Sequence, residues 1–235
     1  MAGGPLEGIK VIDMTSVVVG PLATQTLADH GADVIKVEAP GGDIVRFLAG
    51  RGRTAGMSGK YLHLNRNKRS LVLDLKKPGA HDALMRLLKT ADVLIWNMRP
   101  PAMARLKLSY EDVCKVNPKI IYCGMFGFGQ DGRYRDKPAY DTIIQGAGGM
   151  AALHHRAAGE PRYVPMVVAD KVVGLIAVQM IMMALYQRAR TGEGAAIEIP
   201  MFENLVKFVL EEHLYLKTFE PPLGSTGDPR LIDPQ

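Results

Sequence analysis

The chain has little cysteine and few aromatic residues. Its 235 residues include two cysteines, Cys114 and Cys123, and aromatic side chains make up 6% of the sequence. Because the two cysteines lack CxxC spacing, they exclude a disulfide-rich scaffold, and we expect both to be reduced and structural. This usage is typical of an intracellular protein. We expect a cytoplasmic location, with mitochondria and peroxisomes as alternatives.

The chain also lacks an uninterrupted apolar run of membrane-spanning length. The most apolar stretch, residues 165–185, reads PMVVADKVVGLIAVQMIMMAL and contains Asp170, Lys171 and Gln179. These polar residues favour a buried helix over a membrane span, so we expect no membrane partner. Residues 1–8, MAGGPLEG, lack a basic segment followed by an apolar core, and we expect no secretory signal.

Charge of one sign is only modestly in excess, with a net charge of +5 and a sequence pI near 9.2. Nucleic-acid binding requires a clustered basic face with interleaved aromatic residues, and only HLNRNKRS at residues 63–70 approaches one. We therefore expect no nucleic-acid partner. The content of 47% apolar and 23% charged residues is typical of a folded globular protein.

The first part of the chain alternates between the periods of strands and helices. Residues 8–14 and 32–38 are β-rich, and residues 20–31 between them read as a helix with proline in its first turn and glycine at its end. The alternation continues with expected strands at 69–75, 91–97 and 119–129 and expected helices at 79–90 and 101–108. Apolar strands that alternate with helices predict a doubly wound α/β fold, in which helices cover both faces of a mainly parallel, Rossmann-like sheet.

The order changes after residue 139. We expect a helix at 139–153, a loop at 154–164, a helix from Asp170 to about Arg190, a strand at 195–201, an amphipathic helix at 202–219, and an irregular tail. The pattern predicts a Rossmann-like large domain over residues 1–200. Residues 201–235 are predicted to form a linker helix and tail.

The turn of the first βαβ unit invites comparison with dinucleotide-binding folds. It reads MTSVVVGP, and Glu38 ends the next strand 18 residues after Gly20, as a ribose-binding acid does. The dinucleotide fingerprint needs G-x-G-x-x-G so that the backbone approaches the pyrophosphate, whereas valines occupy this turn. NAD is therefore a distant alternative.

Asp170 is the carboxylate inside the most apolar run, and two interpretations of it are compatible. An acid just before a helix caps the helix by accepting a backbone N–H and complements its dipole. The same donors hold a carboxylate ionised and oriented, and such a group among apolar side chains is a competent nucleophile toward an activated acyl group.

Several segments together carry a family resemblance. They are GIKVIDMTSVVVGPLATQTLADHGADVIKVEAPGGD, NKRSLVLDLKKPG, ADVLIWNMRPPAMARL, PAYDTIIQGAGGM and RTGEGAAIEIPMFE. The chain resembles the class III CoA-transferases, which include formyl-CoA and carnitine CoA-transferases and the related α-methylacyl-CoA racemases. The match runs in order over nearly the whole chain.

The resemblance implies transfer of CoA from an acyl-CoA donor to a carboxylic acid acceptor. In the family, an aspartate at the position of Asp170 attacks the donor thioester and gives a mixed anhydride and CoA thiolate. The thiolate then forms an aspartyl-CoA thioester, and the acceptor acid repeats the steps in reverse. Such covalent catalysis divides one difficult transfer into easier ones.

The resemblance also implies a CoA site along the carboxyl ends of the strands, where open α/β sheets bind ligands. The matched positions are Val17, Leu73, Lys76, Asn97, Met98, Arg99, Arg105, Tyr140, Asp141 and Met201. Lys76, Arg99 and Arg105 are expected to face phosphates. From local pattern alone, these three are solvated surface residues, and Asn97 is a helix cap.

Tyr140 favours transferase over racemase. The racemases carry a histidine at the matching position, where it moves an α-proton together with the aspartate, and tyrosine is a poor base at neutral pH. A racemase-like isomerase and a CoA-binding fragment without turnover remain alternatives. His154 and His155 have no metal-ligand spacing with cysteine or acid, so we assign them no catalytic role and expect no metal.

The chain is shorter than the family pattern. Family members run to roughly twice this length, a size that divides into two domains, and their interlocked homodimers use a linker like residues 202–235. The small domain and the closing glycine-rich loop of the family have no counterpart here. The chain is therefore interpreted as an N-terminal piece, a split subunit or a truncated product, and a homodimer is expected if the full-length chain is present.

Overall fold

A computed structural model describes residues 3–48 and 50–224. Within them the chain forms two compact units. The first, here called the sheet unit, comprises the residues up to Met125 together with Gly174–Ile199. The second, here called the helical unit, comprises Phe126–Val173 and the residues from Pro200 onward. Each unit is described by itself, and the predicted boundary at residue 200 remains a prediction.

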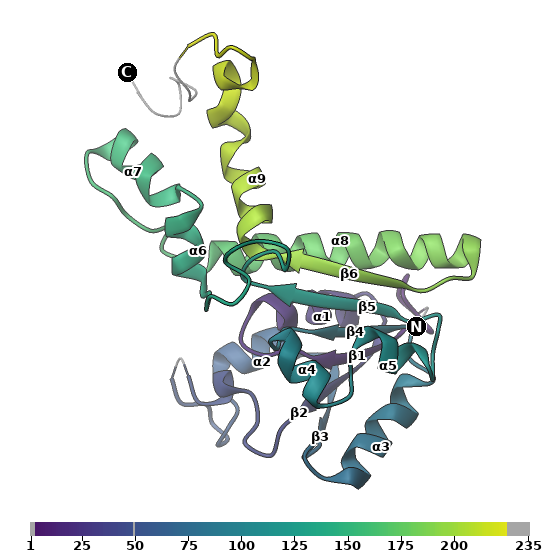
Figure 1. The fold of residues 1–235 in the computed structure, drawn as a ribbon. Coiled ribbons are helices and arrows are strands. Elements are labelled where there is room, and N and C mark those ends of the chain that lie inside the picture. The colour runs from purple at the N-terminus through teal and green to yellow at the C-terminus, as the bar shows by residue number, and fades with distance from the viewer. Residues whose placement is uncertain (1–2, 49, 225–235) are drawn as a thin grey trace. The chain divides into compact units, whose positions relative to one another are not determined.

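The sheet has six strands in the order β3-β2-β1-β4-β5-β6 (Figure 1). The strands are β1 (Lys10–Met14), β2 (Asp33–Glu38), β3 (Lys68–Val72), β4 (Val93–Trp96), β5 (Ile121–Phe126) and β6 (Ala195–Pro200). β1 pairs in parallel with β2 and β4, and the pairs β2–β3 and β4–β5 are parallel as well. The strand order reverses between β1 and β4, where doubly wound sheets bind their ligands. The predicted fold class is confirmed.

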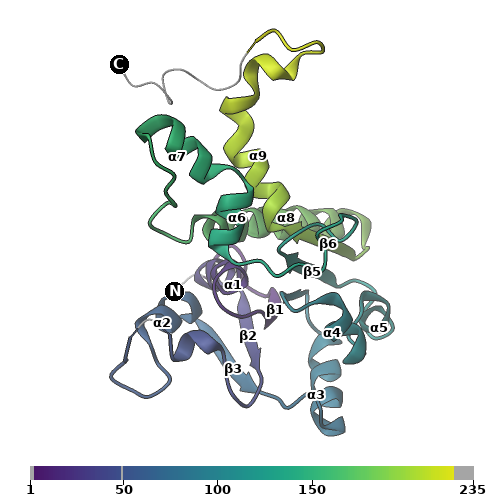
Figure 2. The same cartoon turned by 60° about the vertical axis from the view of Figure 1, so that its left-hand side comes forward.

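Helices cover both faces of the sheet, as the two views in Figures 1 and 2 show, with α1 on one face and α3, α4 and α5 on the other. Their bounds are α1 (Val19–Asp29), α3 (Pro78–Leu88), α4 (Pro100–Arg105) and α5 (Tyr110–Cys114). Every residue of β4 and β5 is buried, which explains why these strands read as continuous apolar runs.

The long helix α8 (Val168–Thr191) is buried along one face. Ala177 and Ile181 are fully buried, whereas Met183 is 61% exposed, so the predicted buried helix is buried on one face only. Gly174 permits a close approach to α1, because a Cβ there would lie 2.8 Å from the carbonyl oxygen of Val19. By length and composition alone, α8 is the one helix among the described residues that meets the requirements of a membrane span.

The helical unit contains α6 (Asp141–Ala147), α7 (Met150–Ala158), α9 (Met201–Leu214) and the 3₁₀ turn η2 (Tyr215–Thr218). The single helix expected at 139–153 is divided, because Gly149 adopts a φ of +87° that ends one helix before the next begins. Helix α7 continues to Ala158 and thus occupies the start of the expected loop. The end of the expected tail, residues 225–235, lies outside the described residues.

Three short helices were missed from the sequence. They are η1 (Ile44–Arg46), α2 (Gly59–Asn65) and α5. Ser58 accepts a hydrogen bond from the backbone N–H of Tyr61, and Ser109 accepts one from that of Asp112, so both serines are N-caps. These serines were the available signal, but helices of one or two turns carry too little periodicity to be recognised.

Candidate functional site

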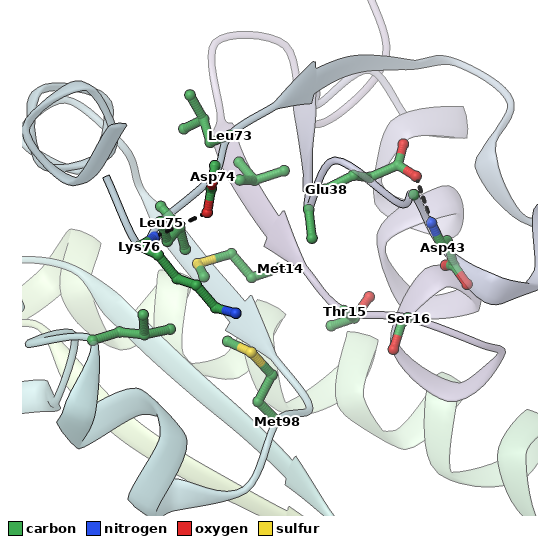
Figure 3. A pocket seen from close by; sticks show the side chains of 14 residues that line it. Met14, Thr15, Ser16, Glu38, Asp43, Leu73, Asp74, Leu75, Lys76 and Met98 are labelled. Carbon is green, nitrogen blue, oxygen red and sulfur yellow. Dashed lines mark hydrogen bonds between the residues drawn. The ribbon is translucent and has the colours of Figure 1, made fainter. Parts of the chain in front are cut away.

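A cavity of about 360 Å³ opens at the carboxyl ends of β1 to β4 in the sheet unit (Figure 3). Of the residues matched by resemblance, Leu73, Lys76 and Met98 line it. Thr15 and Ser16 contribute polar atoms from the turn after β1, and Lys76 is the one cation among the lining residues. A mainly apolar cavity with a few convergent polar groups has the character of a small-molecule site.

Val17 lies in the turn between β1 and α1, here called the β1–α1 turn (residues 15–17). Its φ of +70° is in the left-handed region. For a β-branched residue this conformation costs about 1–3 kcal/mol and persists only where the surroundings impose it. Its backbone N–H donates to both carboxylate oxygens of Asp43, each at 3.3 Å. The turn is therefore held in a strained shape.

Asn97 holds the same turn from the end of β4. Its side-chain oxygen accepts the Ser16 N–H at 3.0 Å, and its side-chain nitrogen donates to the Ser16 carbonyl oxygen at 2.9 Å. The interpretation of Asn97 as a helix cap was wrong, because Arg99 occupies the N-cap position of α4. Asn97 instead links the carboxyl ends of the two strands at the reversal point of the sheet.

The two arginines of the matched set are exposed and do not line the cavity. Arg99 precedes the first residue of α4, and Arg105 is its last residue. A cation at the C-terminus of a helix complements the helix dipole without any ligand. Contact of these side chains with phosphates remains a prediction.

Glu38, the candidate ribose-binding acid, is engaged within the sheet unit. It accepts hydrogen bonds from the Arg46 guanidinium at 2.6 and 2.8 Å, from the Tyr61 hydroxyl at 3.0 Å and from the Ser70 hydroxyl at 2.9 Å. Burial alone would raise the pKa of Glu38, but the Arg46 guanidinium, the Asp43 backbone N–H and the Ser70 hydroxyl lower it to about 2. A ribose would have to displace several of them, which argues against NAD.

Gly20 has a packing role in place of a phosphate-binding one. A Cβ at this position would lie 2.3 Å from the side chain of Thr15, so only glycine allows the first turn of α1 to approach the end of β1. The sequence signal that resembled part of a dinucleotide fingerprint therefore has a structural cause.

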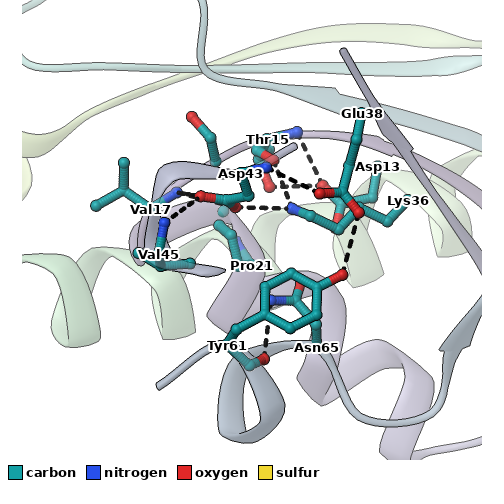
Figure 4. Close-up of polar contacts among 12 residues, drawn as sticks. Asp13, Thr15, Val17, Pro21, Lys36, Glu38, Asp43, Val45, Tyr61 and Asn65 are labelled. Carbon is teal, nitrogen blue, oxygen red and sulfur yellow. Dashed lines mark hydrogen bonds and ion pairs between the residues drawn. The ribbon is translucent and has the colours of Figure 1, made fainter. Parts of the chain in front are cut away.

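Two buried ion pairs lie in the sheet unit, and Asp43 of one pair also lines the cavity (Figure 4). Lys68 contacts Asp13 at 3.0 Å and Lys36 contacts Asp43 at 3.1 Å, and all four side chains are at most 1% exposed. Burial would raise the pKa of Asp13, but Lys68 and Lys36 hold it well below its usual value. Burial also lowers the pKa of Lys68 to about 8, against the opposing effect of Asp13.

The basic run at residues 63–70 forms ion pairs within the chain. Arg66 pairs with Asp29, Lys68 with buried Asp13, and Arg69 with Asp33. These cations neutralise acids of the same sheet unit. The run therefore has a structural explanation that does not involve nucleic acid.

Asp170 is the third residue of α8 and is 9% exposed. It lies within the first helical turn, so its interpretation as the residue just before the helix was wrong. Its backbone N–H donates to Oδ1 of Asp141 at 3.1 Å. Asp141, at the start of α6, is 6% exposed, and its carboxylate thus caps one of the unpaired N–H groups at the start of α8.

Gln145 is a further residue of this site that the sequence interpretation missed. It is fully buried, and its side-chain nitrogen donates to Oδ2 of Asp141 at 2.5 Å and to the carbonyl oxygen of Met166 at 3.1 Å. Its side-chain oxygen accepts the N–H of Val164 at 2.9 Å. Gln145 therefore ties α6 to the segment that leads into α8. The i, i+4 spacing of Asp141 and Gln145 was the available signal.

The other matched residues of the helical unit differ in exposure. Tyr140 is 68% exposed at the N-cap position of α6, and Met201 is 5% exposed at the start of α9. His154 and His155 lie on α7. Among the residues that the structure describes, no group of three or more histidine, cysteine or acidic side chains is placed to hold a metal ion.

Comparison with known proteins identifies the family. The model of the CoA-transferase family III matches residues 6–229. A succinate–glutarate CoA-transferase of Agrobacterium fabrum is 40% identical over 226 residues, which cover 93% of this chain and 56% of the relative. A formyl-CoA:oxalate CoA-transferase of Streptomyces avermitilis is 40% identical over 83% of this chain and 47% of its own length.

The solved structures agree. The crystal structure of a CaiB/BaiF family protein from Brucella suis superposes with a TM-score of 0.86 at 35% identity, over 95% of this chain and 59% of that one. The chain thus spans about half the length of the curated relatives it matches. With the model match over nearly its whole length, the chain belongs to the CoA-transferase family III.

Proposed function

We propose that this chain carries the CoA-binding cavity and the nucleophile of an enzyme that transfers CoA from an acyl-CoA to a carboxylic acid. The family match supports the reaction class. The name of one relative compared above pairs succinate with glutarate, and the name of the other pairs formyl-CoA with oxalate. Both names point to small carboxylic acids as substrates. The donor and the acceptor are left open within that class.

Asp170 is the proposed nucleophile. One of its carboxylate oxygens attacks the thioester carbonyl carbon, the carbon–sulfur bond breaks, and a mixed anhydride and CoA thiolate result. The thiolate then attacks the Asp170 carbonyl carbon, which gives an aspartyl-CoA thioester and releases the donor acid as a carboxylate. The acceptor carboxylate attacks this thioester, the carbon–sulfur bond breaks, and a second mixed anhydride and CoA thiolate result. The thiolate then attacks the acceptor acyl carbon, which gives the CoA thioester of the acceptor and regenerates the Asp170 carboxylate.

The observation that carries this proposal is the placement of Asp170 in the first turn of α8. The helix dipole and nearby N–H groups at a helix start favour the ionised carboxylate, which is the nucleophilic form. The bond from the Asp170 N–H to Asp141 fixes the backbone at this point. A fixed backbone reduces the entropy that the nucleophile loses on reaching the attack geometry.

The cavity of the sheet unit is proposed to receive part of the CoA moiety. Its apolar lining suits an organic ligand, and Lys76 supplies a positive charge for a phosphate. Val17, Leu73, Met98 and Asn97 are proposed as further CoA contacts from this unit. In the helical unit the proposed contacts are Tyr140, Asp141 and Met201, and the exposed Arg99 and Arg105 are proposed for phosphates.

A homodimer is proposed for a full-length protein of this family that contains this chain. Helix α9 and the residues after it expose large apolar side chains, among them Phe208 at 56% and Phe219 at 53%. Exposed apolar surface on this scale is typical of an interaction surface. Interlocking of the two chains through this segment is part of the proposal.

The test is intact-protein mass spectrometry after incubation with a panel of acyl-CoAs and trapping with hydroxylamine. We expect a hydroxamate on the unsubstituted chain and none on the Asp170→Ala variant, because only an activated Asp170 carbonyl reacts with hydroxylamine. Asp82→Ala is the matched control, because the Asp82 side chain is 71% exposed and lies outside both sites.

The outcomes separate two functions. A trapped product that depends on Asp170 supports the transferase mechanism and identifies the accepted acyl group. Binding of CoA without any trapped product would instead support a CoA-binding chain that does not turn over alone. The second outcome would be consistent with the length of the chain, which covers 56% of a transferase of its family.

A further inference from the structure

The backbone of the β1–α1 turn is held by three side chains from three different places in the sheet unit. The Lys36 ammonium, on β2, donates to the carbonyl oxygen of Thr15 at 2.8 Å. Asn97, after β4, pairs with both backbone groups of Ser16. Asp43, in the loop after β2, accepts the N–H of Val17. Each of the three residues of the turn is therefore hydrogen-bonded by a different side chain.

We infer that Lys36 and Asp43 are positioning residues that shape the β1–α1 turn for the ligand of the cavity. The inference rests on the proposed function, in which that ligand is CoA. Asn97 and Val17 belong to the positions matched by family resemblance, whereas Lys36 and Asp43 are identified by the contacts in Figure 4. Asp43 also lines the cavity, whereas Lys36 does not, and the proposed effect on the turn requires no contact of either side chain with the ligand.

The burial of the pair supports a role beyond stability. Lys36 and Asp43 contact each other at 3.1 Å with side chains that are each 1% exposed. A buried ion pair costs desolvation that its mutual attraction barely repays, so apolar side chains of similar volume serve stability as well. This pair makes directed bonds to Thr15 and Val17 that apolar side chains cannot make.

The strained backbone of the β1–α1 turn needs to be restrained by its surroundings. A valine with a φ of +70° relaxes toward the ordinary β region unless its surroundings prevent it. Asp43 also accepts the N–H of Val45 at 3.1 Å, so its carboxylate is fixed from both sides. Thr15 and Ser16 line the cavity, and relaxation of the turn therefore changes the cavity's polar surface.

The test compares Lys36→Met, Asp43→Asn and the double variant with the unsubstituted 235-residue chain. Each single variant leaves a buried charge without its main partner and is expected to unfold more easily. The double variant has no such charge, and its unfolding midpoint is expected to return toward that of the unsubstituted chain. Arg69→Met, which removes an exposed cation of β3, is the matched control.

Binding of CoA, measured by titration calorimetry, separates positioning from stability. We expect the affinity of the double variant for CoA to fall on the order of 10-fold or more although its stability has recovered. The reason is that the Thr15 carbonyl oxygen has lost its hydrogen bond from Lys36. Recovery of CoA affinity together with stability would overturn the inference. Arg69→Met is expected to bind CoA as the unsubstituted chain does.

Amide hydrogen exchange of the segment that contains residues 14–18 gives a readout that does not require CoA. We expect faster exchange there in the double variant, and unchanged exchange would overturn the inference. If the unsubstituted chain binds no CoA, the proposed function fails, whereas the exchange result still decides whether Lys36 and Asp43 hold the turn. The two failures are thus distinguishable.

Discussion

The sheet unit and the helical unit hold their functional residues in different ways. In the sheet unit, the buried ion pairs are Asp13 with Lys68 and Lys36 with Asp43, and Asp43 itself lines the cavity. In the helical unit, the backbone of Asp170 is held by Asp141, which the neutral amide of Gln145 supports in turn. The first arrangement places ion pairs next to a cavity, and the second fixes the backbone around the start of α8 by directed hydrogen bonds.

The difference follows from what each place has to provide. A cavity at the end of a sheet already lies next to a large apolar core. The buried charges there hold the backbone in a defined shape, and the stability of the core offsets their desolvation cost. At the start of α8 the groups that need fixing are backbone N–H and C=O groups, and the side chains of Asp141 and Gln145 fix them by directed hydrogen bonds.

The largest expected effect concerns the pair of Lys68 and Asp13. Lys68→Met leaves the Asp13 carboxylate buried without its closest cation, so the free energy of unfolding is expected to fall by about 3–5 kcal/mol. Denaturant unfolding followed by fluorescence of Trp96, the single tryptophan, reports this unit. The double variant Asp13→Asn with Lys68→Met should recover most of the loss. A decrease below about 1 kcal/mol would show that the charges are not essential.

Acid should weaken the sheet unit next. The folded-state pKa of Glu38 is lowered from 4.5 to about 2, and that of Asp13 is also lowered. Between these values the unfolded chain binds more protons than the folded chain, so stability is present above about pH 4.5 and is lost as the pH falls toward 2. Urea unfolding at a series of pH values measures this. A midpoint that stays constant across this window would contradict the assignment.

A smaller effect on stability, but a specific one on chemistry, is expected for Gln145→Leu. The substitution leaves the Val164 N–H and the Met166 carbonyl without their buried partner, which costs about 1–3 kcal/mol. Because Asp141 also loses the hydrogen bond from Gln145, trapping of the Asp170 intermediate should slow by about 10- to 100-fold.

The control for this variant is Gln130→Leu, which removes a single hydrogen bond to Phe128 in the same unit. It should leave the trapping rate unchanged. If both variants slow trapping equally, Gln145 has no special connection with Asp170. If Gln145→Leu changes stability but not the rate, its role is only structural.

The smallest effect is expected for Arg69→Ala. Its ion pair with Asp33 is bidentate, but the two side chains are 66% and 44% exposed. Exposed pairs contribute about 0–1 kcal/mol and are screened by salt. Thermal unfolding at low and high ionic strength should therefore show a small shift that salt removes. A loss as large as that of Lys68→Met would mean that burial does not distinguish the two classes of pair.

The fold class and the family could be predicted from the sequence alone. The apolar segments that form β4 and β5 predicted a sheet covered on both faces, because burial on both sides requires apolar residues throughout. The family motifs led to Asp170 as the candidate nucleophile and to Leu73, Lys76 and Met98, which do line the cavity. Short helices such as α2 escaped notice because one or two turns show too little periodicity.

The polar residues that support these sites could be identified only from the folded structure. Lys36 and Asp43 meet although one is in a strand and the other in a loop, and Gln145 reaches Val164 across 19 positions of the chain. Glu38 keeps the position of a ribose-binding acid but is engaged by Arg46 and other donors. Periodicity and motifs describe neighbours along the chain, whereas these bonds depend on distances that exist only after the sheet and helices have packed.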